Sequence, residues 1–410
     1  MSRSVPYYLN HIHTLFELVL RRATPTNVPV YCLHEPTSGC NLKCPACPTG
    51  VGVANVKETA ELADYEAVCA EFGQYLDIYY LFNWGEPTMA KSLPAIIQRL
   101  RSEPFEVHMS TNFSVPLKDE VIAALAGMPN LDLRINIDGA TQDSHQKYRV
   151  NSKLSIIVDN CERLANAIKA SPTPPKKVYV GFLAFDYNAA EYPAVKELAT
   201  RFGFKSHKFD NPLVAGEPLP VGNLDVQQAF GCTWLYSSIS PTPKLSHVAP
   251  CCGVWDGAMM SPHIAGRSLH ETFMHEALYM QRRTVDAAFA ALPVETRVAH
   301  LTKNLAEEEG MALGQKDSKV DACVGCTMGK SYQNKLTFLV NNATQSYADL
   351  FKIDHAKAQA RIFGVLEKLV PGQESDPGLR NRLYRILDMP AAGVRSREHY
   401  TLFSQFLAAL

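Results

Sequence analysis

The sequence predicts an α/β fold built on a parallel sheet with helices outside it. Between residues 30 and 212, short apolar runs alternate with segments in which apolar residues recur every three or four positions, so strands and helices should alternate. Most of the six strand segments are nearly continuous apolar runs, as in parallel strands that helices cover. In a (β/α) barrel such strands end at one rim, where these folds build their sites.

The order of the elements follows from the positions of the apolar residues. A helix over 6–22, with Leu9, Ile12 and Phe16 on one face, comes first within residues 1–29 and should pack on one end of the barrel. The expected strands are 30–33, 78–82, 105–109, 131–137, 177–185 and 204–209. The expected helices between them are 65–75, 93–100, 117–125, 154–168 and 192–202.

The charge composition limits the classes of binding partner that the sequence favours. Lys plus Arg (40) and Asp plus Glu (41) nearly cancel, so nothing favours nucleic acid or an anionic membrane surface, and a small or peptidic substrate is expected. No apolar stretch approaches the roughly 20 residues that span a bilayer, and the N-terminus fits no secretory signal. The eleven cysteines therefore indicate metal-binding thiols in a reducing cytoplasm.

The first cysteine set directly follows the first strand. Cys40, Cys44 and Cys47 are too close together to pair as disulfides, whereas as thiolates they can hold three irons of a 4Fe-4S cluster and leave the fourth iron open. The open iron can chelate S-adenosylmethionine (SAM), so that one electron cleaves the sulfonium and releases a 5'-deoxyadenosyl radical. The alternative is a zinc knuckle, which needs a fourth ligand such as His34.

Further motifs accompany this loop, and together they resemble the radical SAM superfamily. Trp84-Gly85-Glu86-Pro87 is similar to the Gly-Gly-Glu-Pro segment of that family, which implies that Gly85, Glu86 and Pro87 hold the SAM amino group. Ser110-Thr111-Asn112 resembles the strand-end segment that contacts the ribose, which implies roles for Ser110 and Asn112. The family fold is an open, partial (β/α)6 TIM-like barrel, and six units match it.

A later segment of the chain also resembles the radical SAM superfamily. Asn136-Ile137-Asp138-Gly139, followed by Tyr148-Arg149, is similar to a family segment, which implies that Asp138 and Arg149 serve SAM, with Arg149 near its carboxylate. Ala46 departs from the pattern, because many members have an aromatic residue there that packs on adenine. His34 and Glu35 adjoin the loop and are expected to support it.

A second cysteine set follows a linker rich in Pro and Gly at 211–222. Counting alone allows zinc or iron-sulfur. Cys232-Thr233-Trp234 and Val248-Ala249-Pro250-Cys251-Cys252 resemble the SPASM/twitch extension of radical SAM enzymes, which implies a cysteine-rich domain at 213–330 with one auxiliary 4Fe-4S cluster. The expected ligands are Cys232, Cys251, Cys323 and Cys326, with the choice between Cys251 and Cys252 open.

Four residues are candidates on the substrate side. Asp186 and Tyr187 follow the fifth strand and Asp210 follows the sixth, where a base or a substrate contact would lie, although loop capping explains such residues equally well. The spare thiol Cys252 could donate a hydrogen atom to a substrate radical. Residues 331–410 turn mainly helical, clearest at 356–369 and 379–387, and should form a cap or else a partner-binding surface.

The resemblance implies an oxidoreductase-like enzyme whose adenosyl radical removes hydrogen from a substrate carbon, with electrons from flavodoxin or ferredoxin. Because roughly 30 residues before the barrel are too few for a peptide-recognition domain, a small sugar, cyclitol or amino-acid-derived intermediate is expected. The alternatives are a peptide-modifying maturase or epimerase, and a non-enzymatic scaffold with structural zinc.

Overall fold

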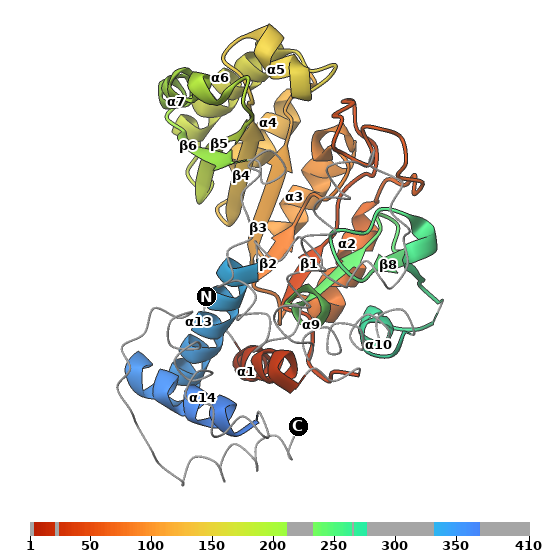
Figure 1. The fold of residues 1–410 in the computed structure, drawn as a ribbon, viewed down its shortest axis with the longest axis vertical. Coiled ribbons are helices and arrows are strands. Elements are labelled where there is room, and N and C mark those ends of the chain that lie inside the picture. The colour runs from red at the N-terminus through yellow and green to blue at the C-terminus, as the bar shows by residue number, and fades with distance from the viewer. Residues whose placement is uncertain (1–3, 21–23, 211–232, 265, 277–331, 370–410) are drawn as a thin grey trace.

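The computed structural model describes residues 4–20, 24–210, 233–264, 266–276 and 332–369. Its centre is a nine-stranded sheet in the order β6-β5-β4-β3-β2-β1-β7-β8-β9 (Figure 1). The first six strands are β1 (Tyr31–Leu33), β2 (Ile78–Tyr80), β3 (Glu106–Thr111), β4 (Leu131–Asn136), β5 (Lys177–Ala184) and β6 (Lys205–Asp210). Neighbours among them pair in parallel, which confirms the expected α/β fold with a partial barrel.

Helices connect the parallel strands. They are α2 (Leu62–Phe72), α3 (Leu93–Leu100), α4 (Asp119–Ala126), α5 (Gln142–Tyr148), α6 (Leu154–Ala170) and α7 (Tyr192–Arg201). The α3 helix has its expected bounds, whereas α2 begins earlier than expected because Glu61 and Asp64 form a capping box at its start. The α5 helix was not expected, since its sequence is polar and it depends on a capping box of Thr141 and Ser144.

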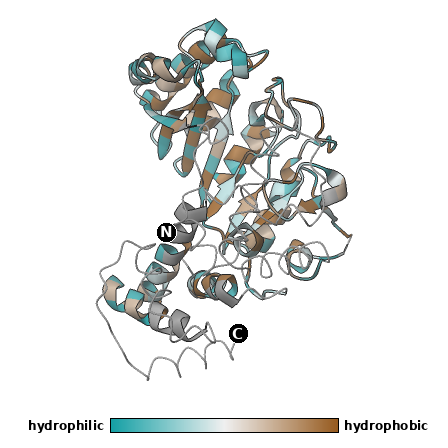
Figure 2. Ribbon diagram, in the orientation of Figure 1, coloured by the Kyte–Doolittle hydropathy of each residue, from teal (hydrophilic) through white to brown (hydrophobic). Residues whose placement is uncertain are grey.

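The two faces of the sheet differ. On β3 and β4, Val107, Met109, Leu131, Leu133 and Ile135 are fully buried and belong to the core that the sheet shares with its helices. The alternating residues of these strands are only partly buried and form what we call the inner face; on these two strands it consists of Glu106, His108, Ser110, Asp132, Arg134 and Asn136. Figure 2 shows this mixture of hydrophobic and hydrophilic residues along the strands.

The sheet continues beyond β1 with strands from the region expected to hold the auxiliary cluster. β7 (Ser238–Pro241) pairs in parallel with β1, and β8 (His247–Ala249) and β9 (Ser261–Pro262) follow in antiparallel pairs. The sequence did not predict this continuation. The strands after residue 232 therefore extend the barrel sheet instead of forming a separate one.

Helices cover the amino end of the strands. α1 (Val5–Leu20) packs against α13 (Tyr332–Phe351), which is followed by α14 (His355–Leu369), as Figure 1 shows in red and blue. Asp77, just before β2, lies 3.2 Å from His11 Nε2 of α1 and accepts a hydrogen bond of 2.7 Å from Asn342 Nδ2 of α13. The N-terminal helix thus packs on a barrel end, on the side opposite the strand termini that carry the cofactor motifs.

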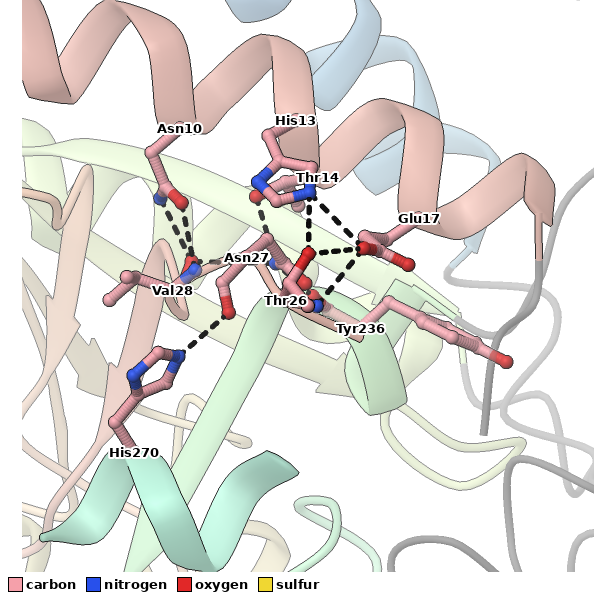
Figure 3. A network of polar contacts seen from close by, with 9 residues as sticks. All are labelled: Asn10, His13, Thr14, Glu17, Thr26, Asn27, Val28, Tyr236 and His270. Carbon is pink, nitrogen blue, oxygen red and sulfur yellow. Dashed lines mark hydrogen bonds and ion pairs between the residues drawn. The ribbon is translucent and has the colours of Figure 1, made fainter. Parts of the chain in front are cut away.

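A polar network ties α1 to the region after the linker (Figure 3). Asn10 exchanges two hydrogen bonds with the backbone of Val28, at 2.9 and 2.8 Å. Asn27 Nδ2 donates to the carbonyl of Tyr236 in α9 (Thr233–Ser237) at 2.7 Å, and the Asn27 carbonyl lies 3.0 Å from Nε2 of His270 in α10 (Leu269–His275). No described helix is long and apolar enough to cross a membrane. The expected helix over 379–387 lies outside the described residues.

Candidate functional site

Cys40, Cys44 and Cys47 lie on the loop that follows β1, at the carboxyl end of the parallel strands. Cys44 is buried, and Cys40 and Cys47 are partly exposed. The backbone N–H of Cys47 donates to the carbonyl of Cys44 at 3.1 Å, which tightens the loop. A side chain at Gly50 would lie 2.3 Å from the Cys44 carbonyl, so only glycine allows this close packing.

The three thiols are not grouped as ligands of a single metal ion in the described residues. A tetrahedral zinc ion brings its sulfur ligands within about 4 Å of one another, because each Zn–S bond is about 2.3 Å long. In the described part of the chain, no three His, Cys, Asp or Glu side chains converge in that way. A 4Fe-4S cluster instead gives each thiolate its own iron, so its three sulfur ligands lie farther apart.

Burial raises the pKa of Cys40 to about 12 and also raises the pKa of Cys44, so both thiols keep their protons until a metal replaces them. The positive charge of Arg149 opposes this rise at Cys44. Arg149 thus lies close enough to favour a thiolate there.

Glu86 joins the ends of two strands. Its Oε1 accepts hydrogen bonds from the backbone N–H and the hydroxyl of Thr88, at 3.0 and 2.6 Å, and from the hydroxyl of Thr111. Its Oε2 accepts from the backbone N–H of Asn112 at 2.7 Å. Burial raises the pKa of Glu86 against these hydrogen bonds. The carboxylate therefore fixes the segment after β2 to the end of β3, a different set of partners from the SAM ammonium that the resemblance implies.

Gly85 and Glu35 hold the backbone of the same segment. A Cβ at Gly85 would lie 1.8 Å from the carbonyl oxygen of Thr37, so this backbone packs directly on the chain leading to Cys40. Glu35 Oε2 accepts from the backbone N–H groups of Trp84 and Gly85 at 2.7 and 2.6 Å, and burial raises the pKa of Glu35 to about 7. Pro87 is buried at the start of a short 3-10 turn, Pro87–Met89.

The end of β3 reaches the first cysteine. Asn112 Nδ2 donates to Cys40 Sγ at 3.7 Å and to Asn41 Oδ1 at 3.0 Å. Ser110 Oγ, on the inner face, accepts from Asn136 Nδ2 and from Arg134 Nε, both at 3.0 Å. The strand-end segment that the resemblance assigns to the ribose therefore adjoins the cysteine loop.

Asp138 and Arg149 form a buried ion pair. Asp138 is fully buried, and its Oδ2 accepts from Arg149 Nε at 2.6 Å while its Oδ1 accepts from the backbone N–H of Leu183 at 2.7 Å. The pair fixes the segment after β4 to the end of β5 and orients Arg149 toward Cys44.

The substrate-side candidates lie at the same end of the sheet, and Tyr187 is near enough to Asp138 and Arg149 for their charges to act on its pKa, which burial raises. Asp186 and Tyr187 are exposed on the turn after β5, and the Tyr187 ring stacks on Phe185 with 5.4 Å between ring centroids. Asn188, which sequence reasoning missed, holds that turn: its Nδ2 donates to the Asp138 carbonyl at 2.8 Å. Asp210 ends β6 opposite Ala184 of β5, and its side chain is outside the described residues.

Of the second cysteine set, the structure describes Cys251 and Cys252, on the turn after β8. Cys251 packs beside Ala249 and Val254. Burial raises the pKa of Tyr80 on β2, and the nearby Cys252 adds to this rise. Cys232, Cys323 and Cys326 lie outside the described residues, so the auxiliary ligand set stays a prediction.

Known proteins show what this arrangement resembles. Residues 34–184 match the model of the Radical SAM superfamily. Mycofactocin maturase MftC of Mycobacterium ulcerans is 25% identical over 179 residues, which is 43% of this chain and 46% of the relative. PqqA peptide cyclase of Xanthomonas campestris pv. campestris is 25% identical over 179 residues, which is 43% of this chain and 45% of the relative. The aligned part thus spans less than half the length of these curated relatives.

Among solved structures, Streptococcus suis SuiB covers 62% of this chain and 68% of its own with a TM-score of 0.50 at 11% identity, which supports the fold alone. The family model and the cysteine loop at the carboxyl end of a parallel sheet agree, and a radical SAM domain has a 4Fe-4S cluster and SAM as its cofactors. The resemblance inferred from the motifs is confirmed, because residues 34–184 of the chain are a radical SAM domain.

Proposed function

We propose that this protein is a radical SAM enzyme that binds its 4Fe-4S cluster through Cys40, Cys44 and Cys47 and acts on a peptide. The observation that supports the first part is the convergence on one cysteine loop of Asn112 from the end of β3 and Arg149 from the segment after β4. Once bound, the cluster and SAM supply a 5'-deoxyadenosyl radical for hydrogen abstraction.

The residues of the chain then have distinct positioning roles. Glu35 and Glu86 hold the backbone of residues 84–87 in one conformation. The Glu86 and Pro87 carbonyls accept from the backbone N–H groups of the turn that follows, so the carbonyls of Trp84 and Gly85 would receive the SAM ammonium. Asn112 donates to the sulfur of Cys40, and Ser110, at the same strand end, would be the hydroxyl that contacts the ribose. Arg149, neutralised by Asp138, offers its remaining N–H groups to a carboxylate.

The peptide substrate replaces the small biosynthetic intermediate that the sequence favoured. The named relatives are a maturase and a peptide cyclase, so the comparisons support the alternative better than the first expectation. The short segment before the barrel does not exclude a peptide, because a precursor peptide can dock elsewhere on the enzyme or be presented by a separate protein.

The second cysteine set completes the proposal. Cys232, Cys323, Cys326 and one of Cys251 and Cys252 would bind an auxiliary 4Fe-4S cluster that receives an electron from the substrate radical, in an oxidoreductase-like reaction. Flavodoxin or ferredoxin in the cytoplasm would supply the electron for the first cluster. Asp186, Tyr187 and Asp210 remain candidates for substrate contact at the rim.

Anaerobic purification tests the proposal. The protein should bind iron and sulfide, absorb in the visible range, and form 5'-deoxyadenosine from SAM with dithionite. Cys44→Ala should abolish this product, because two thiolates do not retain the cluster. Cys161→Ala, which removes a buried thiol on α6, is the matched control and should keep both iron and activity.

Stoichiometric zinc without iron in the purified protein would overturn the proposal that it is a radical SAM enzyme. The peptide part is tested with peptides encoded beside the gene. A peptide substrate should accelerate 5'-deoxyadenosine formation and lose hydrogen or gain a cross-link by mass spectrometry. Activity on a sugar or cyclitol with no response to these peptides would restore the first expectation.

A further inference from the structure

Arg134 places a positive charge in the middle of the inner face. It is opposite Ser110 of β3 and Tyr179 of β5 in the register of the sheet. It lies two residues before Asn136, and therefore deeper in the barrel than the rim where the cofactor motifs gather. The side chain is partly buried, and this burial lowers the pKa of Arg134 without removing its charge.

The partners of this guanidinium are neutral. Nε donates to Ser110 Oγ at 3.0 Å, and the central carbon lies 5.7 Å from the ring centroid of Phe82 and 5.4 Å from that of Phe209. The Tyr179 hydroxyl is also close, since the guanidinium opposes the rise in the pKa of Tyr179 that burial causes. Within the described ranges, no carboxylate lies within the 4.0 Å of an ion pair with Arg134.

The acidic residues nearby are already paired. Asp132, the preceding inner-face residue of β4, lies 3.4 Å from Lys177 Nζ. Glu106 contacts Lys176, and Asp138 is bound to Arg149. A partly buried cation without an anionic partner is less well solvated than an exposed one, and an incoming anion would offset that cost.

A glycine keeps space for this side chain. A Cβ at Gly181 of β5 would lie 2.9 Å from Cδ and 3.0 Å from Cγ of Arg134, closer than side chains normally approach. Any larger residue at position 181 would therefore displace the guanidinium. The backbone of β5 is thus fitted to the present position of Arg134.

We propose that Arg134 binds a carboxylate group of the substrate inside the barrel, between the rings of Phe82 and Phe209. This inference rests on the proposed peptide substrate and names the group that is recognised, either an Asp or Glu side chain or a chain-terminal carboxylate. A single guanidinium matches the charge and planar shape of one carboxylate. A phosphate dianion fits less well, because Asp132 and Glu106 place two carboxylates on the same face.

The test compares probes that differ only in charge, on the anaerobically reconstituted full-length protein with SAM bound. N-acetyl-L-glutamate methylamide and its glutamine analogue represent a side chain, N-acetylglycine and its amide represent a chain end, and inorganic phosphate is the competing anion. Affinities are measured by ligand-detected NMR on wild type, Arg134→Gln, Gly181→Ala and Arg201→Gln. Arg201 is an exposed arginine on α7 and serves as the matched control.

Wild type should bind one of the carboxylate probes on the order of tenfold or more tighter than its amide, as expected for a charge-assisted hydrogen bond. Arg134→Gln should abolish that preference, Gly181→Ala should weaken it with the charge still present, and Arg201→Gln should retain it. The better carboxylate pair identifies the source of the group.

Three results would overturn the proposal: no preference in wild type, a preference that survives Arg134→Gln, or phosphate binding tighter than either carboxylate. SAM cleavage is measured on the same preparations. If SAM affinity falls in Arg134→Gln while the carboxylate probes show no preference, Arg134 serves SAM instead. If wild type forms no 5'-deoxyadenosine but prefers the carboxylate, the proposed function fails and the binding role of Arg134 stands.

Discussion

The side-chain amide of Asn112 donates a hydrogen bond to the sulfur of Cys40 over 3.7 Å. The two residues are far apart in the chain, and the contact joins the end of β3 to the first expected cluster ligand. Hydrogen bonds to cluster sulfurs stabilise the reduced state, because that state carries more negative charge.

Asn112→Asp should therefore lower the reduction potential of the first cluster by a few tens of millivolts, since it removes the N–H donor and adds a negative charge. The substitution retains an acceptor for the backbone N–H of Ser114, which donates to Asn112 Oδ1 at 2.8 Å. The measurement is an anaerobic redox titration followed by electron paramagnetic resonance. The exposed Gln98→Glu on α3 controls for added charge, and an equal shift in both variants would rule out the contact as the cause.

Glu86→Gln should lower the free energy of unfolding by about 1–3 kcal/mol, because one carboxylate oxygen becomes an NH₂ group that faces backbone or hydroxyl donors. The same change should raise the SAM concentration needed for half-saturation. Denaturant unfolding and SAM titration measure the two effects. Glu120→Gln, on the exposed side of α4, should change neither the free energy of unfolding nor the SAM concentration for half-saturation. If Glu86→Gln also leaves both quantities unchanged, the hydrogen bonds by which Glu86 joins the segment after β2 to the end of β3 are dispensable.

Glu35 should make stability depend on pH. Its pKa is raised to about 7 in the folded protein by burial, so the folded state retains a proton that the unfolded state loses above about pH 4.5. The contribution of this group is thus greatest at low pH and falls as pH rises to about 7, by up to about 3 kcal/mol. Glu35→Gln cannot titrate, so the difference in unfolding free energy between wild type and variant should shrink steadily from pH 5 to pH 7. A constant difference would mean that Glu35 is ionised throughout.

Gly85→Ala should abolish SAM binding, because its Cβ would lie 1.8 Å from the Thr37 carbonyl and would push residues 84–87 away from the cysteine loop. Gly257→Ala is the matched control, since a Cβ there meets Asn55 and Val56 at an ordinary 3.5 Å. SAM binding is measured by equilibrium dialysis together with iron content. Normal SAM affinity in Gly85→Ala would contradict the tight packing seen here.

Local patterns predicted the regular elements, and tertiary contacts decided the rest. The apolar spacing of α3 gave its bounds, and the cysteine spacing located the site loop. The apolar pattern does not predict α5, because its seven residues, from Gln142 to Tyr148, are mainly polar and a capping box stabilises them. β7 was missed because a short strand becomes visible only through its partner, in this case β1, which lies about 200 residues earlier in the chain.

The features of the candidate site also fall into two groups, those that a local motif predicts and those that depend on contacts between distant residues. The motifs predict roles for Gly85, Asn112 and Arg149, and these roles stay predictions. They do not reveal that both carboxylate oxygens of Glu86 accept hydrogen bonds from the end of β3. The role of Glu35 depends on backbone N–H groups 49 and 50 residues away, and no local pattern encodes such a contact. Arg134 did leave a signal, because it alternates with Leu133 and Ile135 on a strand with two different faces.

The pairing of β7 with β1 has a mechanical consequence for the two cysteine sets. β1 leads into the loop of Cys40, Cys44 and Cys47, and β8, which leads into Cys251 and Cys252, lies two strands away in the same hydrogen-bonded sheet. Adjacent strands are about 4.8 Å apart, so the lateral offset between β1 and β8 is about 10 Å and is set by backbone geometry. Substrate entry can then reshape side chains and loops at the rim, while the strands that anchor the two sets of thiols move as one body.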